Sequence, residues 1–394
     1  MSNFIPRLSL LIIVLLMLGC GSVALAQHDP GGITGGGMVG GGTSRPSTKP
    51  ATTRRTTTTP PARPVTPTRT TTDTKNTTAD GYYQQGEKLY SAQKYSEALD
   101  PYLKAVQLNP SMSAAWYRIG WIYNDKEDYE SAIDPLKRAI AQSPNNAAAN
   151  FELGYAYKKL ERYAEATAAF NNTIRIKPDY SGAHYELGWI HNEQKNYDDA
   201  VRELKLAISY RASYPEAYNE MGYALRNLGR YTEAIEDYQE AIRLKPDMGL
   251  AHLGLGDVYY YNTKQYALAA NSYKRGLELR PGNATAEYNL GWCYNDLERY
   301  TEAVAELRKA IEIQSNYPEA HNELGYALHQ LGRYQEAVQS YMIAIQQKTD
   351  YASAHYNLGM SYVAMNNRNA ALQQYRILQR IDQARATKLF NQIK

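Results

Sequence analysis

The sequence predicts an all-α protein built as a solenoid of about nine helix-turn-helix repeats. Each repeat carries two apolar stripes at helical spacing; in one of them Trp116, Ile119 and Tyr123 share the first stripe. A stripe with this period is one face of a helix, so each unit is predicted to bury two such faces against its neighbours. Glycine also recurs every 34 residues, with one step of 35, at Gly86, Gly120, Gly154, Gly188, Gly222, Gly256, Gly291, Gly325 and Gly359.

Residues 1–26 have the layout of a secretory signal peptide. Arg7 precedes the apolar run from Leu8 to Leu18, and Ala24-Leu25-Ala26 offers a cleavage site before the next residue. The run is too short to span a bilayer comfortably. Two alternatives remain open, namely lipidation of Cys20 in a lipoprotein-like box and an uncleaved anchor. Each of the three predicts an exported body that is periplasmic, secreted or anchored to a membrane by its N-terminus.

Residues 27–78 are predicted to be a disordered linker, Gly-rich at first and then rich in Thr, Pro and Arg. Such a segment has almost no apolar surface to bury, so nothing offsets the entropy lost on ordering it. The linker is basic, although the whole chain has a net charge of only +3. The body that follows is therefore mildly acidic, which argues against a nucleic-acid-binding protein.

The predicted repeats begin at Ala79 and are followed by a capping helix. The extra residue in the 35-residue step is expected in YYNTKQY, between the two helices of that unit, and units four and five resemble units seven and eight. A capping helix over 381–394 is indicated by Ala384, Leu389, Phe390 and Ile393. The nine units span 79–112, 113–146, 147–180, 181–214, 215–248, 249–283, 284–317, 318–351 and approximately 352–383.

Small residues recur where the two helices of a unit would meet. Glycine at the eighth position and alanine in the second helix would let the two helices approach closely. The alanines at the first of these positions include Ala98, Ala166, Ala200, Ala234, Ala303, Ala337 and Ala371.

These features together resemble the tetratricopeptide repeat, whose pattern is W-x2-L-G-x2-Y followed by A-x3-F, A and P. The resemblance covers 79–383. It implies a right-handed superhelix whose concave face is lined by the first helix of every unit. It also implies that the fifth, ninth and twelfth positions of each unit face a groove. Trp or Tyr at the ninth position is less expected, because asparagine is the usual residue there.

The predicted groove is rich in aromatic rings and asparagine amides, which suits an extended peptide. A second reading also stands, in which the rings pack across adjacent first helices and only stiffen the superhelix. The predicted groove residues are Tyr117, Trp121, Asn124, Phe151, Tyr155, Tyr185, Trp189, Asn192, Asn219, Tyr223, Tyr288, Trp292, Asn295, Asn322 and Tyr326.

The sequence thus favours a non-enzymatic exported scaffold with a protein or peptide partner, and no nucleic-acid partner. Contact with a membrane is expected only through an N-terminal lipid or an uncleaved leader. The alternatives are a cell-wall or glycan-binding envelope protein and an accessory subunit of an envelope enzyme complex. No catalytic motif, cofactor site or metal site is expected. His184, His191, His252, His321 and His355 are interpreted as packed residues, and Cys293 as a buried, inert thiol.

Overall fold

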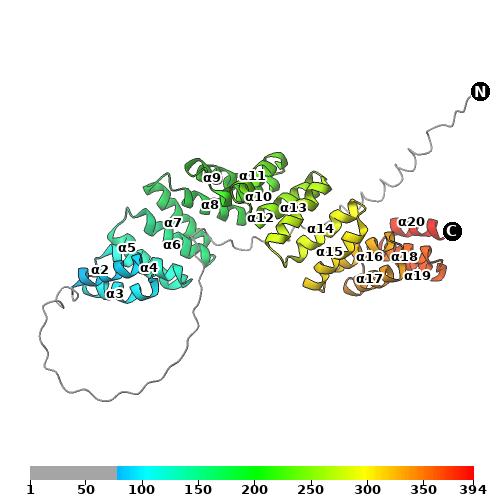
Figure 1. The fold of residues 1–394 in the computed structure, drawn as a ribbon, viewed down its shortest axis with the longest axis horizontal. Coiled ribbons are helices and arrows are strands. Elements are labelled where there is room, and N and C mark those ends of the chain that lie inside the picture. The colour runs from blue at the N-terminus through cyan, green and yellow to red at the C-terminus, as the bar shows by residue number, and fades with distance from the viewer. Residues whose placement is uncertain (1–77) are drawn as a thin grey trace, which may run out of the picture. The chain divides into compact units, whose positions relative to one another are not determined.

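A computed structural model describes residues 78–394 as a chain of helices (Figure 1). The predictions for the leader, for Cys20 and for the linker up to residue 77 lie outside the described residues. Most units contribute a first helix of 13 residues. These first helices are α2 (Ala79–Ser91), α4 (Ser113–Asp125), α6 (Ala147–Lys159), α8 (Ser181–Glu193), α10 (Pro215–Asn227), α12 (Gly249–Asp257) with the π-helical η1 (Val258–Asn262), α14 (Ala284–Asp296), α16 (Pro318–Gln330) and α18 (Ala352–Ala364).

Each first helix is followed by a second helix of 14 residues, and the two pack against each other. Every regular element within 78–394 is a helix, which confirms the predicted all-α solenoid. In the same range, no helix is both long enough and apolar enough to cross a membrane. The second helices are α3 (Tyr95–Leu108), α5 (Tyr129–Gln142), α7 (Tyr163–Ile176), α9 (Tyr197–Tyr210), α11 (Tyr231–Leu244), α13 (Tyr266–Leu279), α15 (Tyr300–Ile313), α17 (Tyr334–Gln347) and α19 (Arg368–Ile381).

Within each unit a three-residue connection reverses the chain. Its middle residue has a left-handed backbone, which lets its own amide and that of the next residue return to the last carbonyls of the first helix. In the second unit, for example, the Glu127 amide donates to the Asn124 carbonyl oxygen at 3.0 Å and the Asp128 amide to the Tyr123 carbonyl oxygen at 2.9 Å. The left-handed residues are Gln93, Glu127, Glu161, Lys195, Gly229, Lys264, Glu298, Gly332 and Asn366.

The small residues do bring the two helices of a unit close together, as predicted. A Cβ atom added to Gly120 would lie 2.4 Å from Leu136 Cγ, and one added to Gly188 would lie 2.5 Å from Leu204 Cγ. Both distances are too short for any side chain, so only glycine fits at these helix crossings. The facing alanines are fully buried, and they are Ala98, Ala132, Ala166, Ala200, Ala234, Ala303, Ala337 and Ala371.

The extra residue of the sixth unit does not lengthen the connection between its helices, so that part of the prediction is wrong. The last turn of the first helix widens into η1, and only three residues separate Asn262 from α13, as in the other units. A π-helical turn absorbs one residue without breaking the helix. Two consecutive tyrosines of η1, Tyr260 and Tyr261, lie edge to face with ring centroids 4.9 Å apart.

The C-terminal helix α20 (Gln383–Ile393) packs on α18 and α19. Leu389 and Ile393 are buried, as predicted for a capping helix, and Phe390 stacks on Tyr375 at 4.9 Å. Ala384 is exposed instead, and Ala386 takes the buried place.

Candidate functional site

The first helices of neighbouring units contact one another over most of the array, for example α6 with α8 and α8 with α10. They therefore form a continuous surface, here called the first-helix surface. The ninth position of six units places an aromatic ring on it, and each of these rings is partly buried and partly exposed. This aromatic row consists of Trp121, Tyr155, Trp189, Tyr223, Trp292 and Tyr326.

Each ring of the aromatic row packs against a tyrosine of an earlier element. Trp121 lies 4.9 Å from Tyr95, edge to face, and the Trp189 ring lies 6.1 Å from Tyr163. In five of the six units this tyrosine is the first residue of the preceding second helix, 26 residues earlier. Trp292 packs on Tyr260 of η1 at 5.3 Å. The row thus combines packing between units with a ring surface left open to solvent.

The fifth-position residues are less accessible than the aromatic row. Tyr185 and Tyr288 are buried beneath Tyr214 and Tyr317, with ring centroids 4.9 and 5.0 Å apart. Each covering tyrosine immediately precedes the next first helix. Tyr117 and Phe151 keep partial exposure, whereas Asn219 and Asn322 are buried. Tyr185, Tyr288, Asn219 and Asn322 therefore lie beneath this surface and not on it.

The asparagines at the twelfth position are also buried, and their amides join adjacent units. Asn192 Nδ2 donates to the Glu220 carbonyl oxygen at 3.0 Å and to Glu220 Oε2 at 3.1 Å. Asn124 does the same to Glu152, and Asn295 to Glu323. We call these three pairs the carboxylate nodes. In each node the asparagine Oδ1 is buried and has no hydrogen-bond partner among the described residues.

Two of the nodes receive a second amide. Asn219 Nδ2 lies 3.4 Å from Glu220 Oε1, and Asn322 Nδ2 donates to Glu323 Oε1 at 3.0 Å. Asn219 and Asn322 thus act on the glutamate that follows each of them in the chain. The two nodes have the same composition, in line with the resemblance of units four and five to units seven and eight.

The node carboxyl groups titrate far from their usual range. Burial raises the pKa of Glu152, Glu220 and Glu323 to about 7, against the lowering effect of the asparagine hydrogen bonds. As whole residues, all three nevertheless keep partial exposure to solvent. These glutamates were not among the predicted groove residues, because the sixth position was not assigned to the groove. The signal that would have found them is an acidic residue recurring at that position, 28 residues after an asparagine or a lysine.

Where the twelfth position is basic, the chain itself supplies a cation to this surface. The Lys158 ammonium contacts the Glu186 carboxylate and lies 4.5 Å from the Trp189 ring centroid. Both charged side chains of this pair are buried. Arg226 contacts Asp257 at 2.5 Å and lies 5.5 Å from the Tyr223 ring. These pairs are cations held between a carboxylate and an aromatic face.

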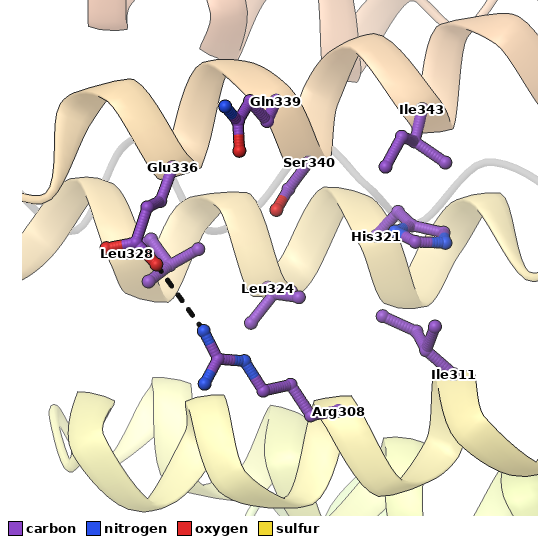
Figure 2. A pocket seen from close by; sticks show the side chains of 9 residues that line it. All are labelled: Arg308, Ile311, His321, Leu324, Leu328, Glu336, Gln339, Ser340 and Ile343. Carbon is purple, nitrogen blue, oxygen red and sulfur yellow. Dashed lines mark hydrogen bonds and ion pairs between the residues drawn. The ribbon is translucent and has the colours of Figure 1, made fainter.

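A separate recess lies between α15, α16 and α17 and contains none of the predicted groove residues (Figure 2). Arg308 and Glu336 close one end of it, with Nη2 and Oε2 3.5 Å apart. Leu324 and Leu328 line it together with other apolar side chains. It is a gap in the packing of three helices, and the aromatic row and the nodes remain the better candidate site.

The histidines at the fourth position are packed residues that hold the chain between units. His184 Nδ1 pairs with Glu203 Oε2 at 2.8 Å, while its Nε2 pairs with the Pro178 carbonyl oxygen at 3.0 Å. His355 makes the equivalent pair of contacts, with Gln374 and Thr349. The described residues include no cluster of three or more metal-ligating side chains. Cys293 is buried, and burial raises the pKa of its thiol well above the usual range.

Comparison with solved structures places this arrangement among tetratricopeptide proteins. The C-terminal part of a TPR repeat-containing protein from Cytophaga hutchinsonii is 16% identical and matches with a TM-score of 0.50, covering 61% of this chain and 99% of that one. YrrB, described as a TPR protein with an unusual peptide-binding site, is 25% identical, with a TM-score of 0.45 over 48% of this chain and 97% of its own. MamA is 23% identical, with a TM-score of 0.40 over 42% and 97%.

None of the curated proteins compared with the chain matches it. Family models do match, and together they cover more than half of the sequence. Models described as TPR repeat match 222–262, 293–332 and 325–366. Models described as tetratricopeptide repeat match 83–147, 151–218, 124–172 and 352–385. With paired helices, glycine crossings and left-handed connections repeated along 78–394, the chain belongs to the tetratricopeptide repeat family.

Proposed function

We propose that the protein is an exported, non-enzymatic scaffold that binds an extended segment of a partner protein along the aromatic row. The observation that carries the proposal is the partial exposure of all six rings at one register of the first-helix surface. Tyrosine and tryptophan rings supply large, rigid contact area at low entropic cost. Repeat proteins of this family generally serve as interaction scaffolds, and none of the matching family models describes a catalyst.

The asparagines enter this proposal differently from the sequence-based expectation. Their amide N–H groups are engaged by the next unit, so they position the surface and do not pair with a peptide backbone. Binding is therefore assigned to the rings and to the partly exposed carboxylates between them.

Export is supported by the leader alone, in which Arg7, the apolar run and Ala24-Leu25-Ala26 follow the order of a signal peptide. Mass spectrometry of the mature N-terminus decides between the processing routes. Cleavage before Gln27 supports a signal peptide, and a lipid-modified Cys20 supports an anchored lipoprotein. A full-length chain found in the cytoplasm overturns the proposal of export.

Peptide binding is tested with the full chain and a displayed library of random 14-residue peptides. We expect wild type to enrich aromatic- or proline-containing sequences, and Trp121→Ala/Trp189→Ala/Trp292→Ala to lose at least tenfold in affinity for them. Trp116→Ala is the matched control, because Trp116 lies on α4 outside the aromatic row and donates its indole N–H to the Pro110 carbonyl oxygen at 2.8 Å. An unchanged affinity in the folded triple variant, or binding of wall glycans only, contradicts the proposal.

A further inference from the structure

Three carboxylates of the first-helix surface have no basic partner. Within residues 78–394, no lysine or arginine forms an ion pair with Glu152, Glu220 or Glu323, and only Lys158 acts on one of them, Glu220, through its charge. All three remain partly exposed, whereas Glu186, which does pair with a lysine, is 3% exposed. The three residues without a basic partner are thus more accessible than Glu186.

One carboxylate of the same surface is paired with a lysine of this chain. Lys158 occupies the twelfth position of unit three, Glu186 the sixth position of unit four, and the Lys158 ammonium also lies within 4.5 Å of Trp189 and 5.7 Å of Tyr155. An ammonium ion between a carboxylate and aromatic faces is bound by charge and by the ring quadrupole together.

The same chemistry recurs at the first unit. The Arg118 guanidinium pairs with Glu87 at 2.8 Å and lies 4.0 Å from the Tyr90 ring centroid. Together with Arg226, these pairs show three cations held on this surface by one combination of groups.

The carboxylate nodes have no basic residue at the place that Lys158 takes in its pair, but the surrounding groups are similar. Asparagine replaces lysine at the twelfth position, and its buried Oδ1 has no donor, so each node has more acceptors than donors. Rings are close by as well. The pKa of the Tyr117 hydroxyl is raised first by burial and second by the charge of Glu152. The pKa of the buried Tyr288 is raised by burial and then by the charge of Glu323. The charge of Glu220 acts likewise on Tyr185, so each node combines a carboxylate and a neighbouring tyrosine with a buried amide oxygen that has no donor.

We propose that the three carboxylate nodes bind lysine or arginine side chains of a basic, extended partner segment, an inference that rests on the proposed peptide-binding function. Charge complementarity selects this partner, because the three carboxylates have no basic partner, while Glu87, Glu186 and Asp257 on the same surface are each paired with a basic side chain. An acidic or neutral segment would leave the node charges unpaired beneath it, which is costly at a partly dehydrated site.

The spacing of the nodes sets the spacing of the cations. Glu152 and Glu220 lie two units apart, and helices in contact have axes about 10 Å apart, so the two nodes are about 20 Å apart. An extended chain advances about 3.3 Å per residue. Two cations about six residues apart therefore match these two nodes.

The test uses two labelled 14-residue peptides of Ser, Thr and Pro, one with two lysines six residues apart and one with glutamine at both places. Binding to the full chain is followed by fluorescence anisotropy at pH 8 and physiological salt. We expect at least a tenfold preference for the lysine peptide, and we expect it to fall below threefold in Glu152→Gln/Glu220→Gln. The variant Glu233→Gln/Glu302→Gln loses two exposed carboxylates of second helices and is expected to keep the preference.

The outcomes separate this inference from the proposed function. Equal binding of both peptides by wild type overturns the inference and leaves the scaffold proposal standing. Binding of neither peptide, together with an empty result from the displayed library, overturns both. Tighter binding of a peptide that copies residues 45–75 of this chain overturns the assignment to a separate partner. Circular dichroism melting of each variant confirms that the helices are retained.

Discussion

The Lys158 ammonium and the Glu186 carboxylate form a buried ion pair that joins the end of α6 to the middle of α8. Lys158 is 5% exposed and Glu186 is 3% exposed, so neither charge has ready access to water. The pair occupies the place taken by asparagine and glutamate in the carboxylate nodes. Among residues 78–394, it is the position of the first-helix surface where a lysine stands in the place of the node asparagine.

Replacing only one partner of this ion pair is expected to destabilise the array strongly. Lys158→Met leaves Glu186 buried without a cation, and the loss of one partner of a buried pair costs about 3–5 kcal/mol. The double variant Lys158→Met/Glu186→Leu removes both charges and is expected to recover to within about 1 kcal/mol of wild type. Urea unfolding followed by circular dichroism measures both. A single variant as stable as the double variant contradicts the buried pairing.

The node glutamates predict a stability that falls as pH rises. Their pKa is raised to about 7 in the folded chain from 4.5, so the folded state binds protons more tightly than the unfolded state. Their contribution is complete below pH 4.5 and is lost as pH rises through 7. Each pKa unit corresponds to about 1.4 kcal/mol, so a shift from 4.5 to about 7 corresponds to on the order of 3 kcal/mol for each glutamate across this window.

The comparison that isolates this effect is wild type against Glu152→Gln/Glu220→Gln/Glu323→Gln. We expect the variant to be the more stable protein at pH 8 and to lose much of the decline in melting temperature between pH 5 and pH 8. Burial also raises the pKa of Asp237 and Glu287 to about 7, and these two residues account for the rest of the decline. Parallel pH profiles for the two proteins would rule out protonation of the nodes as the cause.

The repeat architecture was predictable because its main determinants are local and periodic. Gly120 and Ala132 lie within one unit, and their spacing alone indicates a close helix crossing. The 2.4 Å that would separate an added Gly120 Cβ from Leu136 Cγ confirms it. The same reasoning placed the turns and the capping helix. It misplaced the extra residue of unit six because a π-helical turn and a longer connection have the same residue count.

The site was harder to predict because its contacts join different units. Asn192 and Glu220 are 28 residues apart, and neither position alone shows that the amide is engaged by the next helix. Tyr185 was expected in the groove, but Tyr214 from the following unit covers it. Positions compared within one unit therefore identified the aromatic row and overlooked the nodes.

The helix crossings predict that alanine is not tolerated at the eighth position. In Gly188→Ala the added methyl would lie 2.5 Å from Leu204 Cγ and 3.3 Å from the Ala200 carbonyl oxygen. Overpacking of this kind costs about 1–3 kcal/mol. Gly182→Ala in the first turn of the same helix is the control, since its nearest contact is the flexible Tyr180 ring at 3.3 Å and alanine favours the helix. Thermal melting with a lower midpoint only for Gly188→Ala is the expected result.

The left-handed connections predict two substitutions with opposite effects. Gly332 has φ +73° and no atom within 4 Å of an added Cβ, so Gly332→Ala meets no clash and suffers only the conformational penalty of a left-handed residue, about 1 kcal/mol. Lys195 occupies the same place in unit four with φ +60°, and its side chain is exposed. Lys195→Gly removes that penalty and is expected to stabilise the chain by about 0.5–1 kcal/mol. Urea melts of the two variants that shift in the same direction would contradict a shared backbone conformation at these turns.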